Sequence, residues 1–219
     1  MAQKSDSHRK RSNPAPKKKS SGSNRNMIIA IAVIIIGVVG IAAGVWLMNT
    51  PSNDESEGNA IAVIDTSKGI IRIELYEDIF PKTCENFITL ANEGFYDGMI
   101  FHRIQDDFMI QAGSTFPDGS MVQSPYGNIV FESNDTVKHV DGAISMASTG
   151  AGVGGSAQFF ICDGSQPLLD GSYAVFGRTV EGINVVQDIA DEPHDNSFAS
   201  VGGGRPNTDI IITSITIED

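Results

Sequence analysis

The chain of 219 residues contains only two cysteines and a single tryptophan. Two cysteines cannot build the multi-disulfide framework that stabilises many small secreted domains. Cys84 falls in a predicted helix and Cys162 in an apolar, strand-like run, where a thiol behaves as a small hydrophobic side chain. We therefore expect both cysteines to be buried, and neither to form a bridge or act as a nucleophile.

Basic residues are scarce beyond the first 26 positions. Residues 60–219 contain 23 acidic and seven basic residues, a net charge of −16, whereas residues 1–26 carry +7. Binding to phosphate groups requires clustered lysine and arginine, so the acidic segment argues against nucleic acid as a partner. In the basic tail, serine, asparagine and proline separate the charges and aromatic residues are absent, so we expect a disordered segment rather than a nucleic-acid site.

Residues 27–48 form a run of 22 residues without a charge. A helix of that length spans about 33 Å, enough to cross a hydrocarbon layer of ~30 Å. A cleaved signal peptide would have a shorter apolar region and a small-residue cleavage site, which residues 45–48 do not provide. We therefore favour an uncleaved transmembrane anchor helix over a cleaved signal.

The charges beside the apolar run predict its orientation. Positive residues that flank a membrane helix stay on the cytoplasmic side, so the tail of residues 1–26 is expected in the cytoplasm. Residues 49–59 then form a polar linker, and residues 60–219 form one domain on the other side. The sequence thus predicts a single-pass protein of the cell membrane with an extracytoplasmic folded domain.

Hydrophobic periodicity in the acidic segment predicts mainly β-structure. Residues 61–65 and 70–75 flank a short turn, and the second of them alternates apolar and polar side chains, as in a half-buried hairpin. Residues 81–92 are predicted to be helical, with Pro81 at the first position and Gly94 at the stop. Further strands are expected at residues 100–104, 108–111, 143–147, 158–162, 175–176 and 210–217, and a shorter helix at 185–190. Many strands with two helices predict a β-barrel or sandwich with helical caps.

The densest group of chemically useful side chains lies in residues 101–113, FHRIQDDFMIQAG. If this segment forms two strands around a short turn, Arg103, Met109 and Gln111 share one face. Two later segments, QFFI and LLDG, add an amide, aromatic rings and aliphatic side chains. A fixed cation, amide groups and apolar walls suit a non-polar ring flanked by peptide groups.

Several motifs, in this order, resemble those of the cyclophilin family. The segment FHRIQDDFMIQAG resembles the family signature, in which a Phe-His-Arg strand leads to Phe-Met-x-Gln-x-Gly. The resemblance continues through PKTCENF at 81–87, SMA at 145–147, GSAQFFI at 155–161 and LDGSYAVFG at 169–177. It implies a closed eight-stranded antiparallel β-barrel capped by two α-helices, here preceded by the transmembrane helix.

The resemblance also implies an activity, the cis-trans isomerisation of X–Pro peptide bonds, which needs no metal and no cofactor. By its place in the motif, Arg103 resembles the catalytic arginine. The residues implied for substrate binding are Phe108, Met109, Phe160 and Leu169 around the proline ring, and Gln111, Ala147, Ser148 and Gln158 along the substrate backbone. Leu168 and Tyr173 complete this set.

The chain departs from the family pattern at several of these positions. Leu168 stands where the best-known eukaryotic members have a tryptophan that helps to bind cyclosporin, which predicts weak binding of this drug. Tyr173 replaces a histidine that is common in the family, and Ser148 replaces an asparagine. Asp106 and Asp107 replace a Pro-Gly turn, which we expect to alter the local loop geometry.

These observations predict a peptidyl-prolyl isomerase that acts on proline-containing polypeptides and assists the folding of exported or surface proteins. The alternative is a proline-peptide-binding chaperone or assembly module with little turnover. A hydrolase is disfavoured because neither a Ser-His-Asp order nor the G-x-S-x-G motif is visible in the sequence. The folded domain is expected to be monomeric.

Overall fold

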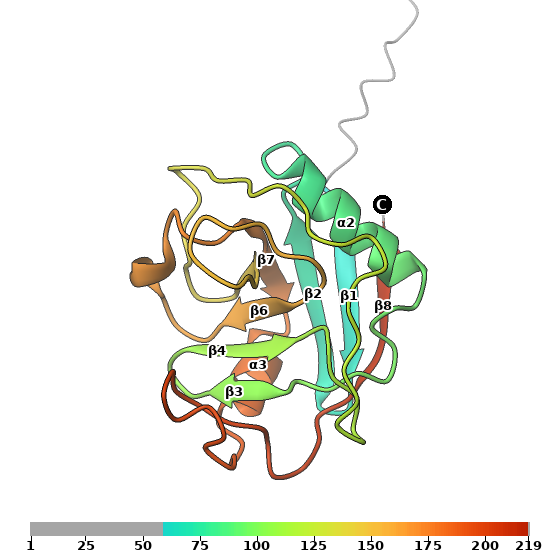
Figure 1. Ribbon diagram of the computed structural model, residues 1–219, viewed down its shortest axis with the longest axis vertical. Helices are drawn as coiled ribbons and strands as arrows, with labels where there is room; N and C mark the ends of the chain where they lie inside the picture. The colour runs from blue at the N-terminus through green and yellow to red at the C-terminus, as the bar shows by residue number, and fades with distance from the viewer. Residues whose placement is uncertain (1–58, 219) are drawn as a thin grey trace, which may run out of the picture. The chain divides into compact units, whose positions relative to one another are not determined.

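The computed structural model describes residues 59–218. The expected basic tail, the expected anchor helix and nearly all of the expected linker lie outside the described residues. Among residues 59–218, neither α-helix is long and apolar enough to cross a membrane. These residues form one curled β-sheet with two α-helices packed against it (Figure 1).

The sheet has eight strands in the order β3-β4-β6-β5-β7-β2-β1-β8, and all of its pairs are antiparallel. The strands are β1 (Ile61–Thr66), β2 (Gly69–Leu75), β3 (Arg103–Gln105), β4 (Met109–Ala112), β5 (Ala143–Met146), β6 (Phe159–Cys162), β7 (Val175–Glu181) and β8 (Ile212–Glu218). The expected strands are thus confirmed, although β3 begins later and β7 extends further than expected. The later start of β3 arises because Ile100 instead forms an isolated bridge with Ile211.

Closure of the sheet differs from the regular barrel that was expected. Within residues 59–218, the ladder has two edges, β3 and β8. The segment before β3 bonds to the start of β8, because the Gly98 N–H donates to the Ile212 carbonyl at 2.8 Å and the Phe101 N–H to the Ile210 carbonyl at 3.0 Å. A short irregular stretch, rather than a continuous ladder, therefore joins the two edges.

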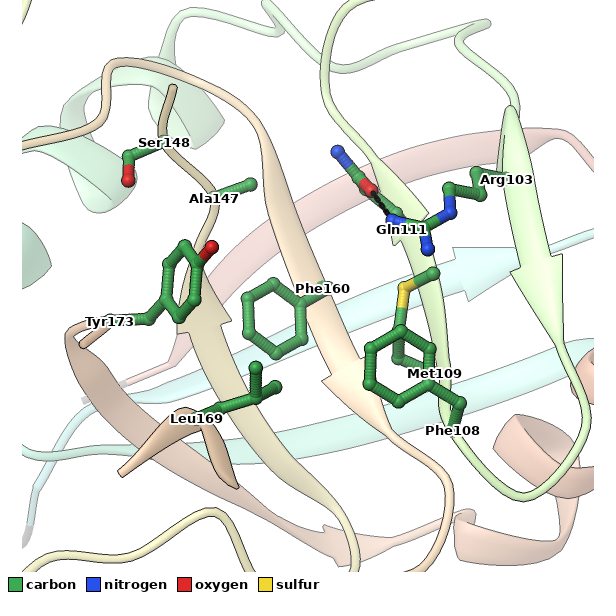
Figure 2. A pocket seen from close by; sticks show the side chains of 9 residues that line it. All are labelled: Arg103, Phe108, Met109, Gln111, Ala147, Ser148, Phe160, Leu169 and Tyr173. Atoms are coloured by element: carbon green, nitrogen blue, oxygen red, sulfur yellow. Dashed lines mark hydrogen bonds between the residues drawn. The ribbon is translucent and has the colours of Figure 1, made fainter. Parts of the chain in front are cut away.

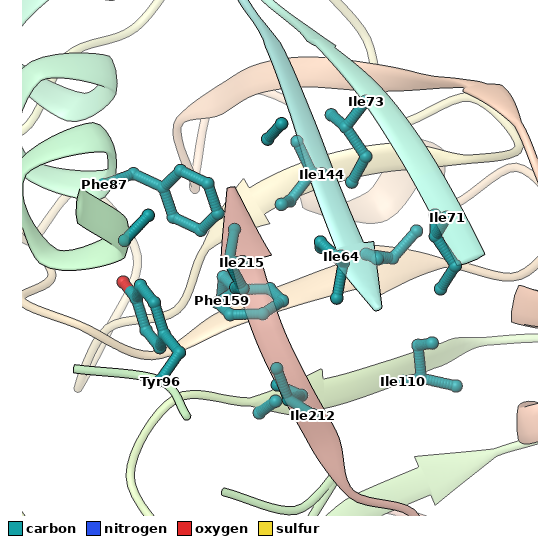
Figure 3. Packing of buried hydrophobic residues seen from close by; sticks show 14 of the residues in the cluster. Ile64, Ile71, Ile73, Phe87, Tyr96, Ile110, Ile144, Phe159, Ile212 and Ile215 are labelled. Carbon is teal, nitrogen blue, oxygen red and sulfur yellow. The ribbon is translucent and has the colours of Figure 1, made fainter. Parts of the chain in front are cut away.

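The main core lies inside the curl of the sheet. Figure 3 shows isoleucines from β1, β2, β4, β5 and β8 packed together with aromatic side chains. The Phe87 ring lies edge-on to that of Phe159, with centroids 5.5 Å apart, and 5.4 Å from the ring of Tyr96. Cys84 and Cys162 are free and buried, and burial raises the pKa of both thiols to about 12. The expectation that they are buried, unbridged side chains is confirmed.

Helix α2 (Pro81–Asn92) contacts β8, whereas α3 (Ile183–Ala190) contacts β2, β3 and β4. Helix α2 begins at Pro81, as predicted, because a missing amide hydrogen costs nothing in the first turn. It is followed by Gly94 in the left-handed conformation, with φ of 68°. A short 3₁₀-helix, η1 (Pro167–Leu169), precedes β7.

A second, smaller apolar cluster belongs to the other face of the sheet. Met109, Phe160 and Cys162 are members of this cluster, whereas their strand neighbours Ile110 and Ile161 belong to the main core. Successive side chains point to opposite faces of a strand, so β4 and β6 carry apolar side chains on both faces. This second face forms the floor of the candidate site.

Candidate active site

A pocket of about 150 Å³ opens over the second apolar cluster. Nine side chains line it: Arg103, Phe108, Met109, Gln111, Ala147, Ser148, Phe160, Leu169 and Tyr173. Figure 2 shows Arg103, Gln111, Phe108 and Met109 on one side, Phe160 in the middle, and Ala147, Ser148, Leu169 and Tyr173 on the other. All nine were singled out from the sequence, and the fold brings them together from four separate stretches of chain.

Strand register places the central residues in one row. Arg103 on β3 is paired with Gln111 on β4, and Gln111 is paired in turn with Phe160 on β6. Paired residues of antiparallel strands present their side chains on the same face. The expectation that Arg103, Met109 and Gln111 share a face is therefore confirmed.

The floor of the pocket is apolar and rigidly packed. Phe160 is 5 % exposed and Met109 is 2 % exposed. The Phe160 ring is stacked on the imidazole of His139, with centroids 5.9 Å apart and planes 7° apart, and it meets the Tyr173 ring edge-on at 5.9 Å. A non-polar ring that enters the pocket thus meets aromatic and thioether surface.

The Arg103 guanidinium lies at the rim of this floor and is held by several contacts. Its Nε donates to the Gly202 carbonyl at 3.0 Å, its Nη2 to the Val201 carbonyl at 2.7 Å, and its Nη1 to Gln111 Oε1 at 3.5 Å. Burial lowers the pKa of this guanidinium from its ordinary value, but arginine remains charged in proteins. The site therefore offers a fixed cation with two N–H groups left for a ligand.

A neighbouring cavity of about 160 Å³ continues the site past Gln111. Gln158, also expected from the sequence, lines this cavity, which shares Gln111, Ala147 and Ser148 with the first pocket. The Gln111 Nε2 donates to Gln158 Oε1 at 2.9 Å, so the amide oxygen of Gln111 is turned towards Arg103. The two cavities form one groove with an apolar part and a polar, amide-lined part.

Leu168 does not line either cavity, contrary to its place in the expected substrate-binding set. It lies in η1, where its side chain is 95 % exposed, while the adjacent Leu169 faces the pocket. The tight turn of a 3₁₀-helix sends neighbouring side chains in different directions. Leu168 therefore lies outside the cavity linings, and its contact with a substrate stays a prediction.

His139 and Asp170 support the floor, and sequence analysis did not single them out. Asp170 Oδ1 accepts bonds from the His139 backbone N–H at 2.9 Å and from its Nδ1 at 3.0 Å. His139 Nε2 lies 3.1 Å from the Ser145 hydroxyl, which donates to the Ala174 carbonyl. Burial lowers the pKa of the His139 imidazole beneath Phe160, while the neighbouring Asp170 acts in the opposite direction.

The series Ser145, His139 and Asp170 has the residue types of a hydrolase triad, although the G-x-S-x-G motif is absent. A nucleophilic serine must reach its substrate, whereas Ser145 is fully buried under the pocket floor. These residues therefore act as a support for Phe160.

The turn between β3 and β4 brings together three carboxylates. Oxygen atoms of Asp106, Asp107 and Asp163 lie within 4.8 Å of one another, and Asp163 Oδ2 accepts the Asp107 N–H at 2.9 Å. Asp107 takes the left-handed conformation with φ of 56°, which aspartate tolerates better than most residues. Asp107 can therefore take the place of a glycine in this turn, and Phe108, the next residue, lines the pocket.

Comparison with known proteins agrees with this geometry. Residues 61–217 match the family model for "Cyclophilin type peptidyl-prolyl cis-trans isomerase/CLD". The chain is 38 % identical over 156 residues to a peptidyl-prolyl cis-trans isomerase-like 1 protein of Neurospora crassa, a match that covers 70 % of this chain and 91 % of that protein. It is 42 % identical over 130 residues to a peptidyl-prolyl cis-trans isomerase of Synechococcus elongatus, covering 58 % and 87 %.

Solved structures show the same likeness. A crystal structure of a cyclophilin-type isomerase from Cryptosporidium parvum superposes with a TM-score of 0.66 at 33 % identity, covering 74 % of this chain and 98 % of that one. A second crystal structure of that protein, in the presence of the dipeptide Ala-Pro, gives a TM-score of 0.65 at 32 % identity, covering 73 % and 99 %. The chain therefore belongs to the cyclophilin family and is a peptidyl-prolyl cis-trans isomerase.

Proposed function

We propose that Arg103 is the catalytic residue of this isomerase and that the pocket binds the proline ring of its substrate. The observation that carries the proposal is the position of the guanidinium, fixed at the rim of the floor that Met109 and Phe160 form. A proline ring on this floor would have its nitrogen near the free N–H groups of Arg103. The Ala-Pro dipeptide present with the Cryptosporidium relative supports this class of ligand.

The chemistry follows from the nature of the peptide bond. Rotation about an X–Pro bond faces a barrier of ~18–20 kcal/mol, because the C–N bond has partial double-bond character. In the twisted state, conjugation is lost and the prolyl nitrogen gains a lone pair that accepts a hydrogen bond. A donor aimed at this nitrogen stabilises the twisted state more than the planar one, which lowers the barrier.

Arginine suits this task because its guanidinium is permanently charged and its donors have a rigid geometry. The reaction needs no proton transfer, in keeping with the neutral His102 beside it. Burial, together with the charge of Arg103, lowers the pKa of His102 to about 4. We assign His102 a structural role.

The polar part of the groove would hold the substrate backbone. Gln111 and Gln158 offer amide groups, and Ala147 and Ser148 offer backbone groups beside both cavities. With the ring held on the floor and the chain held along the groove, the peptide bond between them is the part left free to turn. Leu169 and Tyr173 would limit the ring on the far side.

We further propose that the substrates are exported or surface proteins and that the isomerase is anchored in the cell membrane. The support is in the sequence: an uncharged run at 27–48 follows a basic tail at 1–26. Uncatalysed X–Pro isomerisation takes tens to hundreds of seconds, so a folding aid is useful where proteins emerge from a membrane. Fractionation of cells and protease treatment of spheroplasts test this: we expect the protein in the membrane fraction and its folded domain digested from outside. A soluble protein would refute the anchor, and a membrane-bound protein that is fully protected would refute the extracytoplasmic location of the domain.

The catalytic proposal is tested with the full chain in detergent and its Arg103→Ala variant, on a short Ala-Pro-containing peptide. Removing one preorganised donor of this kind lowers the rate by about 10²–10³. The control is Lys82→Ala, which removes an exposed cation on α2, away from the pocket lining. Binding of the peptide without turnover in the wild type would favour the alternative of a chaperone or assembly module. Unchanged turnover in Arg103→Ala would remove Arg103 from the mechanism.

A further inference from the structure

The loop between α3 and β8 reaches back to the catalytic side of the molecule. The Phe198 ring lies under the Arg103 guanidinium, with its centroid 5.7 Å from Cζ, and the Phe108 ring lies at 5.6 Å. Only Phe108 was expected from the sequence, since Phe198 lies 95 residues beyond Arg103 and in no recognised motif. A cation this close to an aromatic face is attracted by the ring electrons.

The same loop supplies most of the hydrogen bonds that orient the guanidinium. Two of its carbonyl groups, those of Val201 and Gly202, accept from Nη2 and Nε. Arginine has five N–H donors. A third donor, one N–H of Nη1, bonds to Gln111 Oε1. The loop therefore fixes both the tilt and the in-plane rotation of the group, and it leaves one N–H on each terminal nitrogen for the substrate.

The loop is itself bound to the strand that carries Arg103. Ile104 on β3 exchanges two backbone hydrogen bonds with Gly204, at 2.9 and 3.1 Å. Within the loop, the Phe198 N–H donates to the Gly203 carbonyl at 3.1 Å, and the Val201 N–H donates to the Phe198 carbonyl at 2.9 Å. The position of Phe198 relative to Arg103 is thus set by backbone bonds and does not depend on the side chains alone.

Close approach at Gly202 explains how two carbonyl groups can point at one side chain. Gly202 has φ of 87°, and a Cβ there would lie 2.0 Å from Gln105 Oε1. Glycine adopts this conformation readily, and any larger residue there would have to displace the Gln105 side chain. The backbone can therefore turn its carbonyl groups towards the guanidinium.

We propose that Phe198 is a positioning residue for catalysis: with the Val201 and Gly202 carbonyls, it holds the Arg103 guanidinium in the orientation that reaches the prolyl nitrogen. This inference rests on the proposed catalytic role of Arg103. Phe198 does not line the substrate pocket, and its ring faces His102, with centroids 6.5 Å apart, as well as the Arg103 guanidinium. Of these two neighbours only Arg103 lines the pocket, so we expect the loss of Phe198 to act on the substrate through Arg103. Since that donor acts in the twisted state, the turnover number should change while the binding of the planar substrate does not.

The test compares Phe198→Ala, Phe198→Leu and Phe198→Tyr in the full chain, with kcat and KM measured separately on the Ala-Pro-containing peptide. A cation–π contact at a partly exposed site corresponds to about a two- to fivefold change in rate. We expect Phe198→Ala and Phe198→Leu to lower kcat by this factor at unchanged KM. Phe198→Tyr keeps an aromatic ring and should keep the wild-type kcat. The matched control is Phe95→Ala, which removes a half-buried ring that contacts Tyr96 and is not in contact with the guanidinium.

A spectroscopic readout monitors the guanidinium directly. The Nε–H signal of Arg103 is identified in ¹H–¹⁵N spectra by its loss in Arg103→Ala. Aromatic rings shift nearby protons, and a hydrogen bond slows their exchange with water. We therefore expect the signal to move towards that of free arginine and to exchange faster in Phe198→Ala, and to stay near its wild-type position in Phe198→Tyr and Phe95→Ala.

The outcomes separate the two proposals. If Arg103→Ala loses activity while Phe198→Ala keeps the wild-type kcat and Nε–H signal, the role of Phe198 is refuted and that of Arg103 stands. A loss in Phe198→Ala that Phe95→Ala reproduces, or that Phe198→Leu repairs, would also refute positioning by the ring. If Arg103→Ala keeps full activity, the catalytic proposal fails and the inference about Phe198 fails with it.

Discussion

Replacing Asp170 with alanine should destabilise the protein by leaving two donors of His139 without an acceptor. Both donors, the backbone N–H and Nδ1, bond to the same oxygen, Asp170 Oδ1, at 2.9 and 3.0 Å. The His139 side chain is completely buried, whereas the Asp170 side chain is 20 % exposed. An unsatisfied buried donor costs about 1–3 kcal/mol. Because water can enter in part from the Asp170 side, we expect a total loss of about 2–4 kcal/mol in the free energy of unfolding.

The assay is thermal and urea unfolding followed by circular dichroism. For a domain of this size, a loss of that magnitude lowers Tm by about 4–16 °C. Asp170→Asn is the matched control, because its amide oxygen can take the place of Oδ1 and accept both bonds while the negative charge is lost. Charge-assisted bonds are roughly twice as strong as neutral ones, so we expect Asp170→Asn to lose no more than about half as much stability as Asp170→Ala.

Two results would contradict this reasoning. Equal losses in Asp170→Ala and Asp170→Asn would mean that the charge, and not the acceptor, stabilises His139. A loss below about 0.5 kcal/mol in Asp170→Ala, typical of an ordinary surface substitution, would mean that water satisfies both donors.

Two further predictions concern pH and helix capping. Burial lowers the pKa of His102 to about 4. Between about pH 6.5 and pH 4 the unfolded chain therefore binds a proton at this residue and the folded chain does not, so the free energy of unfolding falls as the pH decreases. At pH 5 it should be about 2 kcal/mol lower than at pH 7. Urea unfolding at pH 7 and 5 should show a shallower dependence in His102→Gln, and an unchanged dependence would refute the assignment. Glu132 accepts hydrogen bonds from the backbone N–H groups of Lys82 and Thr83 at the start of α2. We expect Glu132→Ala to lower the free energy of unfolding in urea by about 1–2 kcal/mol, and Glu132→Gln to lower it by less. Equal stability of the wild type and both variants would exclude a capping role for Glu132.

Much of the fold and of the pocket could be predicted from the order of residues. Strands were predicted by alternation and by short apolar runs, and α2 by Pro81 and Gly94, since these signals depend on local geometry alone. The pocket residues were predicted because their motifs resemble those of a known family. The structure does not place Leu168 in the lining of the pocket, since adjacent residues of η1 point in different directions and sequence proximity to Leu169 does not determine exposure.

Other features depend on contacts between distant parts of the chain. The cap of α2 comes from Glu132, 49 residues beyond Thr83, while the residue before the helix, Phe80, makes no side-chain cap. Phe198 meets Arg103 only because the Ile104–Gly204 bridge ties its loop to β3. Such pairings leave no periodic signal, because neither partner lies at a fixed spacing from the other.

The sequence by itself thus determined which segments form strands and helices, which side chains are apolar, and that one arginine stands among motifs for proline recognition. The tertiary structure decided the register that places Arg103, Gln111 and Phe160 in one row, and the support beneath and beside that row. The physical reason is that secondary structure follows from local sterics and hydrophobic pattern, whereas the direction of a catalytic side chain is set by partners that only folding brings together.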